Sequence, residues 1–117
     1  MFRSYFANTN FLSYMTAALY TANDASRRVH SDGLALPDAA KGYVQVTARE
    51  AELLGCSVEL VDVLDVGTGY VAYSIFDYEG GSVNHPAMEA LAQLSGHSFT
   101  QDEDMHLFGP VLIVTDK

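Results

Sequence analysis

The sequence predicts one α+β domain: an N-terminal helix followed by β-α-β-β-α-β, with a four-stranded mixed sheet and the helices packed on one face. Three observations favour this fold. The 117 residues allow one ordinary domain and little more. Strand-like apolar runs alternate with helical patterns along the second half of the chain, and a Gly-Thr-Gly turn at 67–69 joins two of the runs as a hairpin. We therefore expect a single domain, 1–117, with an N-terminal helix and loop over 1–40 and a core over 41–117.

The N-terminal part of the chain has the pattern of a helix and then a loop. Apolar side chains recur at three- and four-residue spacing over residues 10–22, which is typical of an amphipathic helix. Turn-forming residues and Pro37 predict a loop from Arg27 to Lys41. A short strand is expected at 43–46.

The middle of the chain predicts a short helix and a hairpin. Thr47-Ala48-Arg49-Glu50 has the form of a capping box, in which the Thr side chain and the Glu side chain each satisfy a backbone N–H of the first turn. Gly55 is a natural end for this helix. Two strand runs follow, over 57–66 and 69–78.

The C-terminal part predicts a second helix and a buried strand. His85-Pro86 begins the helix, because proline fits the first helical turn, and Gly96 ends it. Residues 97–107 are polar and irregular. Residues 110–115 form a nearly continuous apolar run, so we expect a strand in the interior of the sheet.

Charge is distributed unevenly along the chain. The net charge is −9, from 15 acidic and 6 basic residues. Residues 50–116 contain twelve of the acids and no Lys or Arg. This balance argues against direct binding to nucleic-acid phosphates. Two interpretations remain open: a surface that keeps the protein soluble, or a surface that meets a Lys/Arg-rich partner.

For the second interpretation we expect acids of the hairpin and of the loop before the last strand to bind the partner. They would attract its basic surface by electrostatic steering. The expected partner-binding residues are Asp62, Asp65, Asp77, Glu79, Asp102, Glu103 and Asp104.

No pattern predicts a catalytic, metal or cofactor site, and we do not expect an enzyme. Of four histidines, only His97 and His106, with Asp104, are close enough in sequence to form a local cluster, and none of them has metal-ligand helix spacing. The single cysteine, Cys56, excludes an intramolecular disulfide and is expected to fill the core. The glycines at 67–69 lack the pattern of a dinucleotide-binding loop.

The sequence also predicts a cytoplasmic protein. No apolar run reaches the length of a membrane-spanning helix. Polar residues at 8–10 interrupt the N-terminal apolar run, unlike a secretory signal. A lone cysteine fits a reducing compartment.

Three segments carry a resemblance to a known family. They are the helix–glycine–strand unit at 51–61, Asn-His-Pro-Ala at 84–87, and the run from Leu107 to Val114 that contains Gly-Pro-Val. This pattern, within residues 47–116, resembles a small domain family of unknown function from bacteriophage and plasmid genomes. The resemblance implies an origin in a mobile element.

Two main functions are expected, and a third is weaker. The first is an inhibitor of a host nucleic-acid-handling defence complex, of the anti-CRISPR or antirestriction type, that occupies a Lys/Arg-rich surface. The second is a self-associating structural or regulatory module, such as a homodimer, without catalytic activity. Its contact would be the N-terminal helix with the aromatic residues Phe2, Tyr5, Phe6, Tyr14 and Tyr20. The third is an enzyme or ligand-binding protein that uses His97 and His106.

Overall fold

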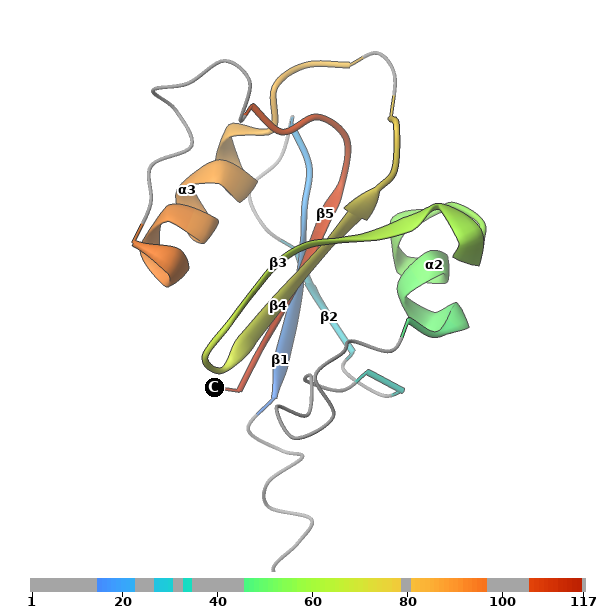
Figure 1. Cartoon of the computed structure of the whole chain (residues 1–117), viewed down its shortest axis with the longest axis horizontal. Coiled ribbons are helices and arrows are strands. Elements are labelled where there is room, and N and C mark those ends of the chain that lie inside the picture. Colours follow the sequence, from blue (N-terminus) through green and yellow to red (C-terminus); the bar gives the residue numbers. More distant parts are fainter. Residues whose placement is uncertain are drawn as a thin grey trace, which may run out of the picture.

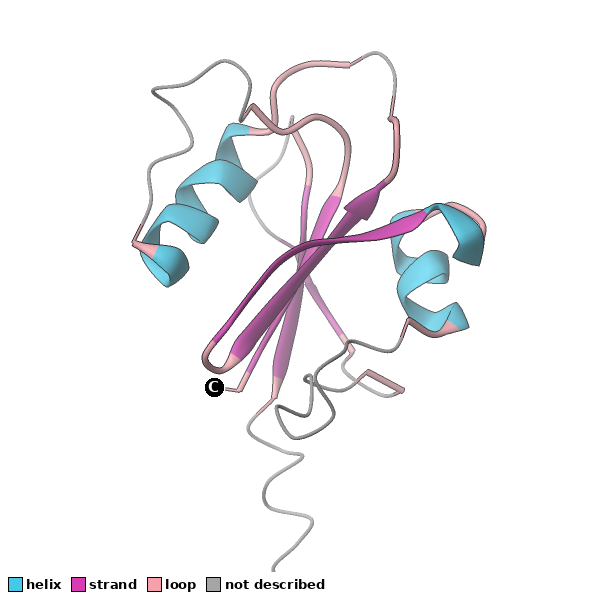
Figure 2. Ribbon diagram, viewed as in Figure 1, coloured by secondary structure: helices cyan, strands magenta, loops and turns pink. Residues whose placement is uncertain are grey.

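The computed structural model describes residues 15–22, 27–30, 33–34, 46–78, 81–96 and 106–116. Within them, five antiparallel strands form one sheet with a helix on each face (Figure 1, Figure 2). In chain order the elements are β1 (Thr16–Tyr20), β2 (Arg27–Val29), α2 (Ala48–Leu54), the 3-10 turn η1 (Val58–Leu60), β3 (Val61–Gly67), β4 (Tyr70–Ile75), α3 (His85–Ser95) and β5 (Val111–Thr115).

The sheet has the strand order β2-β1-β5-β4-β3, and each neighbouring pair is antiparallel. The central strand is β5, and its first four residues, 111–114, are buried. The predicted interior strand at 110–115 is therefore confirmed. The two outermost strands are β2 and β3.

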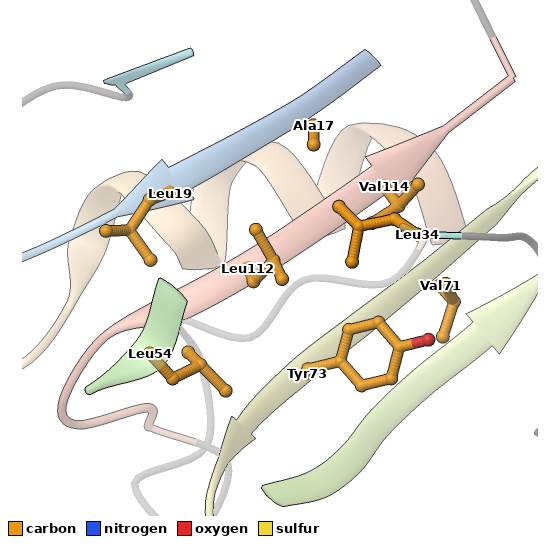
Figure 3. Close-up of a cluster of buried hydrophobic side chains, with 8 residues drawn as sticks. All are labelled: Ala17, Leu19, Leu34, Leu54, Val71, Tyr73, Leu112 and Val114. Atoms are coloured by element: carbon orange, nitrogen blue, oxygen red, sulfur yellow. The ribbon is translucent and has the colours of Figure 1, made fainter. Parts of the chain in front are cut away.

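One face of the sheet packs against α2. Leu54 of this helix lies in a cluster with Tyr73 of β4 and Leu112 of β5 (Figure 3). Cys56 packs against the same cluster, in agreement with the prediction that it fills the core. The buried members of the cluster are Ala17, Leu19, Leu34, Leu54, Val71, Tyr73, Leu112 and Val114.

The other face packs against α3. Met88 and Leu91 are fully buried there, together with Ala72 of β4 and Ile113 of β5. The side chains of β4 and β5 are apolar on both faces, so both faces lose water only if each is covered by a helix. This explains why the helices lie on opposite faces (Figure 1), and the prediction that they pack on one face is wrong.

The predicted N-terminal helix and four-stranded mixed sheet are also wrong. Thr16–Tyr20, inside the predicted helix at 10–22, is β1, which pairs with β5 and with β2. Arg27–Val29, inside the predicted loop, is β2. Pairing with two neighbours overrides the helical preference of Ala17, Ala18 and Leu19. Residues 10–14 lie outside the described part of the chain.

The elements from Thr47 onward follow the predictions more closely. Thr47 caps α2 with the complete capping box, and Gly55 ends it in the left-handed conformation. Gly96 ends α3 in the same way. The hairpin is present, but β3 starts at Val61 because residues 58–60 form η1.

Two other predictions fall mostly on residues that the structure does not describe. Of the predicted strand at 43–46, only Val46 is described, and it belongs to no strand. Of the predicted loop at 97–107, residues 97–105 lie outside the described part. The longer described helix, α3, has 11 residues, and no described helix is long and apolar enough to cross a membrane.

Candidate functional site

The first residues of β3 and the residues after β4 meet at one end of the hairpin. Asp62 lies opposite Ser74 on β4, and the N–H of Phe76 donates to the carbonyl of Leu60 at 2.7 Å. Asp62 and Asp77 are both exposed and belong to this end of the hairpin. We call the group Glu59, Leu60, Asp62, Phe76 and Asp77 the hairpin-base patch.

The hairpin-base patch combines exposed apolar side chains with acids. Phe76 is 61% exposed and Leu60 is 41% exposed. Glu59, Asp62 and Asp77 surround them in the chain and carry no ion pair to any basic residue that the structure describes. An aromatic side chain beside charged residues is typical of a protein–protein interface, in which an apolar centre has a polar rim.

Asp65 is placed differently from Asp62 and Asp77. It is half-buried on β3, where its Oδ2 accepts from the Tyr70 hydroxyl at 2.8 Å and its Oδ1 accepts from the N–H of Val66 at 3.0 Å. Burial, and then the hydrogen bond and charge of Asp65, raise the pKa of Tyr70 to about 12. Tyr70 therefore remains a neutral donor to this carboxylate at physiological pH.

The structure thus describes three of the seven expected partner-binding acids, Asp62, Asp65 and Asp77. Two of them lie in the hairpin-base patch, and Asp65 lies farther along β3. Glu79 and residues 102–104 lie outside the described part of the chain, so the assignment of all seven remains a prediction. Alternation in the sequence does not single out Phe76, because its exposure depends on where β4 ends.

The described part of the chain contains three Arg residues and no Lys. Arg27 and Arg28 are exposed on β2, at the opposite edge of the sheet from β3. Arg49 on α2 forms an ion pair with Glu52 at 3.3 Å. The two edges of the sheet therefore carry opposite charge.

The described residues give little support for a metal site, a histidine cluster or a reactive cysteine. They contain no group of three or more His, Cys, Asp and Glu side chains that could hold a metal ion. His97 and Asp104 of the sequence cluster lie outside the described part, whereas His106 is half-buried just before β5. Burial raises the pKa of the Cys56 thiol, which disfavours the reactive thiolate.

Two cavities lined by described residues adjoin the sheet. One, of about 300 Å³, lies at the end of the sheet between Tyr78, Gly81 and Gly109. The other, of about 340 Å³, lies between α3 and β1 and is lined by Ala18, Tyr20 and Leu94 among others. Tyr20 is the one described member of the predicted N-terminal aromatic contact. No cluster of titratable side chains lines either cavity.

Comparisons with family models, with curated proteins and with solved structures found no match to this chain. The function must therefore be inferred from the residues themselves.

Proposed function

We propose that this protein is an acidic interaction protein that inhibits a host nucleic-acid-handling defence complex, of the anti-CRISPR or antirestriction type. The hairpin-base patch would occupy a Lys/Arg-rich surface that otherwise holds DNA or RNA. The protein would act in the cytoplasm and without a catalytic step.

The observation that carries this proposal is the composition of the hairpin-base patch. Glu59, Asp62 and Asp77 are exposed at the same end of the hairpin as Phe76, which is the most exposed large apolar side chain of the described residues. Acids alone are explained by solubility, whereas two exposed apolar residues that adjoin each other, Phe76 and Leu60, have the composition of an interface centre. An exposed aromatic side chain with carboxylates on the same end of the hairpin suits a basic surface, because Arg guanidinium groups bind carboxylates and also stack on aromatic rings.

The distribution of charge supports the same partner. The chain carries −9 overall, and residues 50–116 have no Lys or Arg. A negative field of this kind accelerates association with a basic surface and repels DNA and RNA. The inhibitor would therefore compete with nucleic acid for a site without binding nucleic acid itself.

A plaque assay tests the proposal. The chain is expressed in bacterial strains that each carry one active restriction or CRISPR complex, and each strain is challenged with a phage that its complex excludes. We expect plaque formation to recover in at least one strain. The double variant Asp62→Lys/Asp77→Lys should weaken binding roughly tenfold or more and lose the protection, because each changed charge turns attraction into repulsion.

The matched control is Glu89→Lys/Asp116→Lys. Both residues are exposed, on α3 and after β5, and the variant has the same net charge as the test variant. It should keep the protection. Equal loss in the two variants would show that only net charge matters, and an absence of protection in every strain would contradict the inhibitor proposal. Thermal melting of both variants verifies that they fold.

A further inference from the structure

The two edge strands of the sheet carry opposite charges. Arg27 and Arg28 are exposed on β2, and β3 carries Asp62 and Asp65. On its outer side, neither strand is paired with any residue that the structure describes. An unpaired strand edge is a template for another strand. Charged side chains on the edge oppose a strand of like charge and favour one of opposite charge.

Arg28 and Asp65 lie at the two ends of one cross-strand row. Arg28 is opposite Ala18 on β1, and Ala18 is opposite Ile113 on β5. Ile113 is opposite Ala72 on β4, and Ala72 is opposite Asp65 on β3. Ala72 and Ile113 belong to the cluster under α3, so every residue of the row is directed to the α3 face.

The directions of the strands allow this row to continue into a second copy. Successive antiparallel pairs across the sheet leave β2 and β3 running in the same direction. A second copy placed side by side would therefore set its β3 beside β2 as a parallel pair. Its Asp65 would then lie next to Arg28 on the same face, across a strand spacing of about 4.8 Å.

The Asp65 carboxylate is already oriented for such a contact. The Tyr70 hydroxyl and the Val66 N–H each donate to one of its oxygens and hold the side chain in place. Each carboxylate oxygen has a second lone pair available, and an Arg guanidinium offers five N–H donors. Ordering this side chain on association therefore costs little entropy.

Charge also excludes the symmetric alternatives. Two β2 edges would oppose Arg to Arg, and two β3 edges would oppose Asp to Asp, so both contacts are repulsive. Only β2 against β3 is attractive. A contact between two different surfaces of the same chain generates an open or ring-shaped assembly instead of a closed dimer.

We propose that copies of this chain associate edge to edge, with β2 of one copy beside β3 of the next and Arg28 paired with Asp65. This self-association replaces the predicted contact through an N-terminal helix. It goes beyond the inhibitor function and does not depend on it.

Sedimentation velocity over a range of protein concentrations tests this association at low and at high salt. The wild-type chain should sediment faster as its concentration rises, and high salt should weaken the effect because it screens an exposed ion pair.

Arg28→Asp should weaken association roughly tenfold, since it places two acids together. Arg27→Asp is the matched control: it changes the same strand by the same charge. Arg27 lies opposite Leu19, whose side chain belongs to the α2-face cluster, so it faces away from the Asp65 row and its variant should associate like the wild type.

A mixing experiment provides the decisive result. Arg28→Asp and Asp65→Arg should each associate more weakly than the wild type when alone, and should co-sediment when mixed, since both interfaces of the mixture pair opposite charges. A wild-type chain that stays monomeric at every concentration would overturn the proposal, as would equal effects of Arg27→Asp and Arg28→Asp. If Asp65→Arg fails to fold, the comparison of the two arginine variants still decides. Arg28→Asp should keep phage protection, so failure of one proposal is distinguishable from failure of the other.

Discussion

The two helices are both anchored by a buried polar residue near their N-termini, but the two anchors act over different distances. In α2, Glu50 accepts hydrogen bonds from the N–H and the hydroxyl of Thr47, three residues earlier. In α3, the Asn84 amide donates to the carbonyls of Tyr20 at 3.0 Å and Gly109 at 2.8 Å, 64 and 25 residues away. The first anchor is local, whereas the second joins α3 to the end of β1 and to the chain entering β5. Removing the second should therefore destabilise the whole sheet.

The largest effect is expected for Asn84→Ala. Asn84 is fully buried, and its Oδ1 also accepts from the Ala87 N–H at 3.1 Å. The variant leaves two carbonyls and one N–H without their partner, so the free energy of unfolding should fall by roughly 3 kcal/mol or more. Asn84→Ser keeps a helix cap and should recover about 1 kcal/mol of this loss. Urea denaturation measures both, and a loss below about 1 kcal/mol in Asn84→Ala would show that the long-range bonds contribute little.

The next largest effect is expected at Gly109, whose carbonyl accepts a hydrogen bond from Asn84. Gly109 has φ +79°, and a Cβ there would lie 2.8 Å from ring atoms of Tyr78. Gly109→Ala should cost about 1–2 kcal/mol for the left-handed backbone and more for the contact with Tyr78. Gly96→Ala is the control, because Gly96 has φ +82° and open space around its Cβ position. Equal losses of unfolding free energy in the two variants would show that the Tyr78 ring moves aside freely.

The local anchor should contribute less. Glu50→Ala removes the capping box of α2 and should lower the free energy of unfolding by about 1 kcal/mol. Glu50→Gln keeps an acceptor at this position and should retain most of the stability. Chemical denaturation of the two variants distinguishes the hydrogen bonds from the charge. A loss in Glu50→Ala as large as that in Asn84→Ala would contradict the distinction between the two anchors.

The same difference in distance explains which parts of the fold the sequence predicts. The capping box of α2 can be recognised in the sequence because Thr47 and Glu50 are close neighbours in the chain, and the helix that it predicts is confirmed. The role of Asn84 cannot be predicted in this way, because its hydrogen-bond partners come from distant segments of the chain. β1 is mistaken for a helix for the same reason: its two pairing neighbours lie elsewhere in the chain, and Ala17 and Ala18 lie on opposite faces that are both at least partly covered.

The candidate site was predictable only in part. The acids of the hairpin are visible in the sequence, and the hairpin that carries Asp62 and Asp65 follows from the turn at 67–69. The bulge between Val63 and Asp65 is not visible, yet it sets Asp65 opposite Ala72 and hence on the α3 face. The opposite charge of the two edge strands cannot be predicted from the sequence either, because Arg28 lies in a segment with no strand pattern.

The smallest effect, on pH dependence, tests whether Glu50 acts through its charge. Burial, and then the charge of Glu50, raise the pKa of Tyr73 to about 12. The pKa of Tyr70 is raised to about the same value. In the unfolded chain the two tyrosines lose their protons near pH 10. The stability that comes from keeping them neutral in the folded protein is therefore complete below pH 10 and is lost as pH rises toward 12.

Glu50→Gln removes the negative charge beside Tyr73 and lowers the pKa of Tyr73 toward the ordinary value. The decline of the melting temperature above pH 10 should therefore be shallower in this variant than in Glu52→Gln, which changes an exposed carboxylate of the same helix. Identical declines in the two variants would mean that burial alone sets the pKa of Tyr73 and that Glu50 serves the helix only through its hydrogen bonds.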